Sequence, residues 1–206
     1  MTIDRVNALR CVPALAAIAI LAACSADKPV DESTDGSAEA AADMVAAGRE
    51  KSMPCLACHG AEGISDHEIW PDLAGQHAEY LAKQLRDFRD GRRYDPWMSP
   101  MAIGLDDRDI DDLSVYFSQL AGMTGGPQSA PPEAMTCVAC HSERAGAASP
   151  LWPSLAGQND RYIAKQLMDF RAGRRTDPVM APLAQPLSDA DIAAVAAHYA
   201  SQRGAP

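Results

Sequence analysis

Apolar residues recur at helical spacing along most of this chain. Stretch 76–90 places four of them on one side of a helix and is followed by Gly91 as a stop: Tyr80, Leu81, Leu85 and Phe88. Stretches 38–51 and 106–120 are also amphipathic, the second with acidic residues in its first turn, where the helix dipole favours them. No alternating run of β-branched residues is long enough to predict a strand. The pattern predicts an all-α fold.

Proline and glycine interrupt the helical pattern at defined places. Stretch 92–105 is punctuated by proline and lacks a helical period, so we expect an irregular loop there. Residues 122–132 are rich in glycine and proline and are predicted to be a short linker. The last helix is expected to start at Ser188, which forms a capping-box pair with Asp191.

The second half of the chain repeats the first at a constant offset of 82 positions. Three pairs show the offset: Cys55 and Cys137, Trp70 and Trp152, Met98 and Met180. The repeat predicts two homologous domains, 38–121 and 133–203, joined by the linker. A unit of about 70 residues has a marginal hydrophobic core, so we expect an additional covalent cross-link to stabilise each domain.

The amino-terminal segment has the features of a bacterial export signal. Residues 1–23 combine a basic start with an apolar run too short to be a comfortable membrane span. Leu21-Ala22-Ala23-Cys24 resembles a lipobox, which implies cleavage before Cys24 and lipidation of that cysteine. Ordinary cleavage near Ala23, leaving no lipid, is the alternative. Residues 24–37 are polar and acidic and are predicted to be a disordered tether.

Each half contains the sequence C-x-x-C-H, which is the attachment signature of c-type haem. Two thiols at this spacing form thioethers to the two vinyl groups, and the adjacent imidazole reaches the iron. We therefore predict two covalently bound haems, attached through Cys55 and Cys58 and through Cys137 and Cys140. A zinc site would need four ligands, and a redox dithiol would need no following histidine.

The iron ligands follow from the same repeat. His59 and His141 are the expected fifth ligands, and a methionine from the following loop is the expected sixth ligand. Met98 and Met101 are both candidates in the first half, but only Met98 has a methionine counterpart, Met180. We therefore choose Met98 and Met180, the alternative being that they fill the core.

The chain resembles the dihaem cytochrome c(4) family, in which two class I cytochrome c domains follow each other. The resemblance covers nearly all of residues 53–199 and rests on both C-x-x-C-H motifs and on a downstream Asp-Pro-x-Met type of loop. It implies that Pro71 and Pro153, each twelve residues after a haem histidine, offer their backbone carbonyls to the two imidazoles. It also implies that the two haems face each other, with electron transfer between them.

Charge and resemblance together suggest a function without catalysis. A net charge of −10 argues against nucleic acid and favours partners that present Lys or Arg. The leading expectation is a periplasmic, membrane-tethered electron carrier of the respiratory chain, between a quinol-oxidising complex and a terminal oxidase, with redox proteins as partners and no small-molecule substrate. One alternative is a cytochrome subunit of a periplasmic dehydrogenase. The other is a dihaem peroxidase, which would require one iron to be open.

Two arginine pairs and two tyrosines also recur in both halves, and the sequence allows two interpretations of each. Arg92-Arg93 and Arg174-Arg175 either balance the haem propionates or are solvated loop charges. Tyr80 and Tyr162 either form hydrogen bonds near the haem or pack on their helices.

Overall fold

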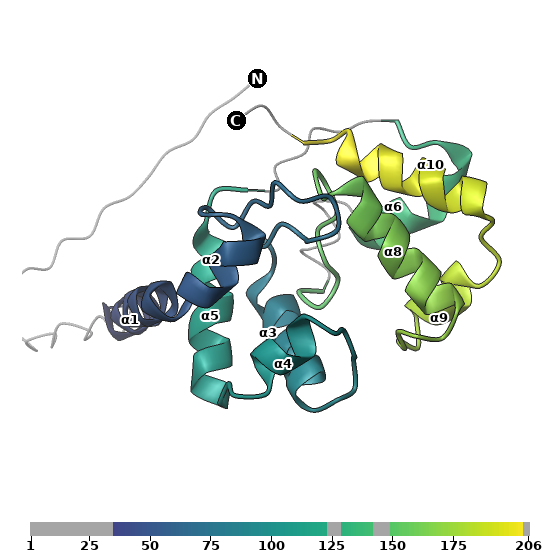
Figure 1. Cartoon of the computed structure of the whole chain (residues 1–206). Helices are drawn as coiled ribbons and strands as arrows, with labels where there is room; N and C mark the ends of the chain where they lie inside the picture. The colour runs from purple at the N-terminus through teal and green to yellow at the C-terminus, as the bar shows by residue number, and fades with distance from the viewer. Residues whose placement is uncertain (1–34, 123–128, 142–148, 204–206) are drawn as a thin grey trace, which may run out of the picture. The chain divides into compact units, whose positions relative to one another are not determined.

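The computed structural model describes residues 35–122, 129–141 and 149–203. The predicted signal segment 1–23, Cys24 and most of the tether lie outside these residues, as does most of the predicted linker. Every regular element in the described part is helical, which confirms the all-α prediction (Figure 1). No helix among the described residues is both long enough and apolar enough to span a bilayer.

The two halves repeat a common set of helices (Figure 1). The first half contains α1 (Asp35–Lys51), α2 (Met53–His59), α3 (Ala78–Arg89), α4 (Met98–Ala102) and α5 (Asp107–Gln119). The second contains η1 (Pro132–Ala134), α6 (Met135–His141), α8 (Asp160–Arg171), α9 (Met180–Ala184) and α10 (Asp189–Ala200). The capping box predicted at Ser188 and Asp191 is present.

The expectation of an irregular loop over 92–105 was wrong in part, because α4 lies within it and α9 lies at the corresponding place. The Asp95 carboxylate accepts hydrogen bonds from the backbone amides of Trp97 and Met98, and so starts α4. Pro100 is the third residue of α4, where the amide that proline lacks has no partner within the helix. Proline therefore does not prevent this helix.

A glycine lets α1 approach α5 closely in the first half. A Cβ atom on Gly48 would lie 2.1 Å from the carbonyl oxygen of Asp112. Lys51 also ties the two helices together, because its Nζ lies 2.7 Å from Oδ2 of the buried Asp112 and 2.8 Å from Oδ1 of Asp109. In the second half, the one regular element among the described residues before the haem motif is the three-residue η1.

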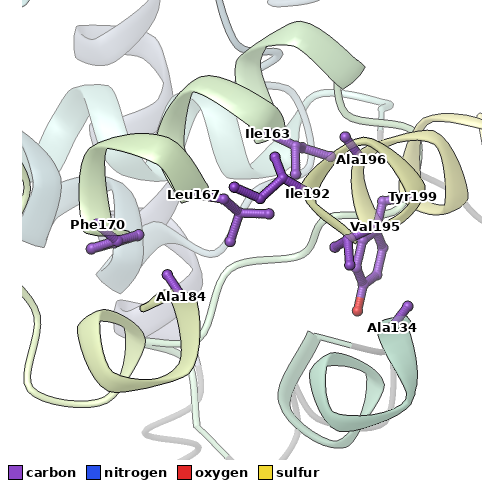
Figure 2. Close-up of a cluster of buried hydrophobic side chains, with 9 residues drawn as sticks. All are labelled: Ala134, Ile163, Leu167, Phe170, Ala184, Ile192, Val195, Ala196 and Tyr199. Atoms are coloured by element: carbon purple, nitrogen blue, oxygen red, sulfur yellow. The ribbon is translucent and has the colours of Figure 1, made fainter. Parts of the chain in front are cut away.

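Each half has its own buried apolar cluster. In the first, four buried side chains come from α3 and α5: Leu81, Leu113, Tyr116 and Phe117. In the second, α8, α9 and α10 pack together with Ala134 of η1, and Tyr199 directs its ring toward the segment that holds Ala134 (Figure 2). Half-buried Cys55 and Cys137 pack against these clusters, so each haem motif adjoins a core.

Candidate haem sites

Each haem-motif helix ends on a buried histidine whose ring is hydrogen-bonded to a backbone carbonyl group. His59 and His141 are the last residues of α2 and α6 and are 5% and 8% exposed. Nδ1 of His59 lies 2.8 Å from the carbonyl oxygen of Pro71, and Nδ1 of His141 lies 2.9 Å from that of Pro153. These contacts confirm the role that the family resemblance implied for the two prolines.

The hydrogen bonds determine what the imidazoles can do. A carbonyl oxygen only accepts, so Nδ1 carries the proton and Nε2 retains its lone pair. Burial lowers the pKa of both His59 and His141 below the ordinary value for histidine, and this favours the neutral ring. Each half therefore presents one neutral, oriented nitrogen ligand of the kind that binds a metal.

The turn that carries Pro71 is fixed by its backbone and by one carboxylate. The amides of Leu73 and Ala74 both donate to the carbonyl of Gly63, which has a φ of 73° that favours glycine. The buried Asp72 carboxylate accepts a hydrogen bond from the amide of Ser65 at 2.8 Å. Ser154 occupies the corresponding position in the second half, so the two sites differ here.

A cavity of about 350 Å³ adjoins the first haem motif. Cys55, Cys58, His59, Met98 and Met101 all line it, together with apolar side chains of α3 and α5. Met101 is 49% exposed, whereas Met98 is half-buried, so Met98 is the more enclosed of the two candidate ligands. The cavity thus joins both thiols, the imidazole and a thioether in one largely apolar space, as a haem requires.

Two buried hydroxyl groups also indicate that a haem fits beside these residues. The side-chain oxygens of Ser114 and Tyr199 have no hydrogen-bond partner among the described residues. Ser114 lines the cavity of the first half. Tyr199 lies in the second core, with its hydroxyl directed toward the segment that begins the second haem motif (Figure 2). Buried polar atoms normally have partners, so these two atoms are consistent with a bound group beside them.

The second half arranges the corresponding residues in the same way. Met180 is the first residue of α9 and packs against the second core, and its amide donates to Oδ1 of Asp177 at 3.0 Å. Met98 has the same bond to Asp95, at 3.2 Å. Among the described residues no three His, Cys, Asp or Glu side chains converge on one point, whereas a zinc site needs four ligands.

The contacts between the two haem domains are not predictable from the sequence. Nε2 of Gln76 donates a hydrogen bond to the backbone carbonyl of Ser154 at 2.9 Å. The backbone amide of Ser154 donates a second one to Oε1 of Gln76, also at 2.9 Å. Gln158 makes the matching pair with the backbone of Asp72, at 3.0 and 2.9 Å. The repeat displayed both glutamines, but nothing in the sequence indicated that each one binds the opposite domain.

Comparison with known proteins agrees with this geometry. Residues 45–121 match the cytochrome c family, and residues 133–198 match the family described as cytochrome c oxidase, cbb3-type, subunit III. Two helical domains with one C-x-x-C-H motif each define a dihaem c-type cytochrome, an electron carrier with two haem c groups. The chain is 39% identical to cytochrome c4 of Pseudomonas aeruginosa, over 79% of this chain and 90% of that protein.

The chain therefore belongs to the cytochrome c4 family. The crystal structure of reduced recombinant cytochrome c4 from Pseudomonas stutzeri superposes with a TM-score of 0.68 at 34% identity, covering 77% of this chain and 98% of that one. Thiosulfate dehydrogenase from Marichromatium purpuratum gives a TM-score of 0.66 at 30% identity, covering 76% of this chain and 40% of that one. The limits of the domains at 38–121 and 133–203 stay a prediction.

Proposed function

We propose that His59 and Met98 ligate one iron, and that His141 and Met180 ligate the other. Cys55 and Cys58 would hold the first haem and Cys137 and Cys140 the second. The observation that carries this proposal is the matched pair of histidine-to-proline contacts, which frees one neutral imidazole nitrogen in each half. A haem c bound in this way supplies one reversible electron at its iron, and a thioether ligand favours the ferrous state.

We further propose that the protein is exported and tethered by lipid to a bacterial membrane, where it relays electrons on the periplasmic side. The support is the segment 1–23 and the cysteine at position 24. Several acyl chains hold a protein stably at a membrane, whereas a single chain binds reversibly. The net charge of −10 favours donors and acceptors with basic docking faces.

The donor we favour is a quinol-oxidising complex, and the acceptor is a terminal oxidase. A dehydrogenase is the second candidate for the donor. A relative from Stutzerimonas stutzeri named thiosulfate dehydrogenase electron acceptor is 32% identical over 73% of this chain and 79% of that protein. The corresponding protein of Thiomonas intermedia is 34% identical over 76% of this chain and 82% of that protein.

The donors are distinguished by the rate at which each reduces the purified holoprotein. We expect fast reduction of both haems by quinol with a quinol:cytochrome c reductase, slowing as ionic strength rises because opposite charges steer the encounter. Fast reduction only by thiosulfate with thiosulfate dehydrogenase would instead support the second candidate.

The lipid anchor is tested separately. Cys24→Ser is expected to move the protein from the membrane fraction to the released fraction, and an unchanged distribution would contradict lipidation.

A further inference from the structure

A buried carboxylate lies next to the histidine proposed as the fifth ligand of the first iron. Asp72 directly follows Pro71, whose carbonyl oxygen lies 2.8 Å from Nδ1 of His59, so one turn of the backbone both orients the imidazole and carries this acid. Asp72 is 4% exposed and lines the same cavity as His59. Burial lowers the pKa of His59, and the negative charge of Asp72 opposes that effect, so the two side chains interact electrostatically.

The other haem domain provides a countercharge for Asp72. Nη2 of Arg203, which follows α10, lies 2.6 Å from Oδ2 of Asp72, and Oδ1 accepts a hydrogen bond from the amide of Ser65 at 2.8 Å. The backbone of the arginine passes close to Gly157, where an added Cβ atom would lie 3.0 Å from Cα of Arg203. The fold of the second domain therefore places this cation on an acid of the first domain.

These partners keep the acid ionised in a buried place. Burial raises the pKa of Asp72 above its ordinary value, whereas the amide of Ser65 and the charge of Arg203 oppose the rise. A buried carboxylate that has both a hydrogen-bond donor and a cation retains its charge at lower cost than an unpaired one. Asp72 is thus a fixed negative charge beside the first haem site, and Arg203 screens part of it.

The second haem site lacks this pair. Ser154 takes the position of Asp72, and Ala121 takes that of Arg203. The second haem histidine nevertheless makes its contact with a proline carbonyl, at 2.9 Å. An acid is therefore not required to hold a haem histidine in this fold, and what Asp72 adds to the first site is its charge.

A fixed charge beside a haem acts unequally on its two oxidation states. The ferric haem carries one more positive charge than the ferrous haem, so a nearby carboxylate favours the ferric state and lowers the midpoint potential. The interaction is stronger in a water-excluded cavity than in solvent. A nearby guanidinium group has the opposite effect. The first potential therefore depends on Asp72 and, to a smaller extent, on how closely Arg203 lies to it.

We infer that Asp72 and Arg203 are a potential-setting pair for the first haem, in which the acid lowers the midpoint potential and the arginine of the second domain limits the decrease. This inference rests on the proposed ligation of the first iron by His59. The pair makes the two irons unequal, and a lower first potential favours passage of an electron from the first haem to the second. Because Arg203 belongs to the second domain, the first potential also depends on the contact between the domains.

The test is a redox titration of the full holoprotein at about pH 8, where carboxylates are ionised, with proton NMR to distinguish the two haems. Asp72→Asn removes the charge and keeps an oxygen for the amide of Ser65, so we expect it to raise the first midpoint potential and to change the second less. Arg203→Gln should shift the first potential in the opposite direction, because it removes the countercharge. The double variant should lie between the two single variants. Asp72→Ser, which introduces the residue of the second half, should reproduce the increase if Asp72→Asn does not fold.

A second ion pair between the domains provides the matched controls. Nε of Arg161 lies 2.6 Å from Oε2 of Glu68, but both side chains are more than half exposed, so water and salt screen their charges. Glu68→Gln and Arg161→Gln should therefore leave both midpoint potentials unchanged. These controls separate the effect of the buried acid from the loss of any ion pair between the domains.

Three results would overturn the inference. One is an equal shift in Asp72→Asn and Glu68→Gln. The second is a shift of the same size in both haems, which would indicate a general effect of net charge. The third is a shift of the first potential by Arg203→Gln in the same direction as by Asp72→Asn, which would indicate a structural disturbance and not a charge effect. Failure of the haem placement itself would show separately, as an unsubstituted protein with fewer than two haems per chain.

Discussion

Met98 and Met180 are the residues on which the proposed chemistry depends. The constant offset of the repeat selected Met98 over Met101, and the structure makes Met98 the more enclosed of the two. A sixth ligand from the protein makes an iron an electron carrier, whereas an open position admits exogenous ligands. The choice between a carrier and a peroxidase therefore lies at these two side chains.

Removing either methionine should open one iron. We expect Met98→Ala and Met180→Ala each to bind one equivalent of carbon monoxide in the reduced state, seen as a change in the visible spectrum. Met101→Ala is the control and should bind none. If both variants remained low-spin and inert to the gas, the ligand assignment would be wrong.

Individual residues were predictable where a motif fixes them to a chemical role. The contacts of Pro71 and Pro153 to the haem histidines followed from a family resemblance and are present at 2.8 and 2.9 Å. Arg93 was not distinguishable from Arg92, because adjacent residues of the same type carry the same signal in a sequence. Only the fold directs one toward the domain contact and the other toward Asp87.

At the scale of elements, the packing of α1 on α5 depends on the missing side chain of Gly48. A Cβ atom there would lie 2.1 Å from a backbone carbonyl oxygen and 2.6 Å from the Cβ of Tyr116, and a backbone oxygen within a helix cannot move aside cheaply. Hydrophobic periodicity predicted both helices well. It did not predict the contact, because a glycine within a helix gives no signal of what lies against it.

Gly48→Ala should therefore destabilise the protein although alanine is the better helix former. Overpacking costs about 1–3 kcal/mol, which exceeds the gain in helix propensity of about 1 kcal/mol. Urea unfolding of the holoprotein measures the difference. Gly104→Ala is the control, because a Cβ there meets nothing within 4 Å, and it should change stability little. Equal stability of the two variants would contradict the close contact of α1 and α5.

The carboxylates at the ends of α3 and α8 should make stability depend on pH. Burial alone would raise the pKa of Asp87, but its hydrogen bonds from Lys83 and Arg92 bring it below the ordinary value, and Asp169 is held low in the same way by Lys165 and Arg174. A lowered pKa in the folded state contributes stability above the unfolded value of about 3.9. That contribution is lost as the pH falls through the folded pKa.

We therefore expect the double variant Asp87→Asn with Asp169→Asn to be less stable than the parent at pH 6. The difference should begin to shrink as the pH falls below about 4, where the unfolded carboxylates titrate, and should vanish below the lowered pKa values of the folded state. Unfolding by urea at several pH values measures this. Asp66→Asn, at an exposed position, is the control. A difference that stayed constant down to low pH would contradict the ion-pair explanation.

For the whole molecule, the arrangement of the two domains was the feature least predictable from the sequence. The repeat predicted two haem domains, but not the surfaces by which they touch, because a repeat records what the halves have in common and not how they meet. Gln76 and Gln158 form a nearly symmetric set of four hydrogen bonds between the domains, whereas the ion pair of Arg203 with buried Asp72, at 2.6 Å, has no counterpart in the other half. Ala121 and Ser154 occupy those positions.

Hydrogen exchange tests the glutamine contacts one at a time. Gln76→Ala should expose the amide of Ser154, which donates to that side chain, and leave the amide of Asp72 protected by Gln158. Each lost bond is worth about 0.5–1.5 kcal/mol, so exchange should accelerate by up to roughly tenfold. Gln158→Ala should give the opposite pattern. Equal effects on both amides would mean that the contact opens as a single unit.

Protein ligands saturate both irons in the proposed structure of the holoprotein, and this saturation is what makes the molecule an electron carrier. The most direct measurement is the optical spectrum of the reduced, purified holoprotein before and after carbon monoxide, with haem quantified per chain. We expect two haems per chain, both low-spin and both unaffected by the gas. Binding of the gas by either haem in the unsubstituted protein would contradict it and favour a peroxidase-like site.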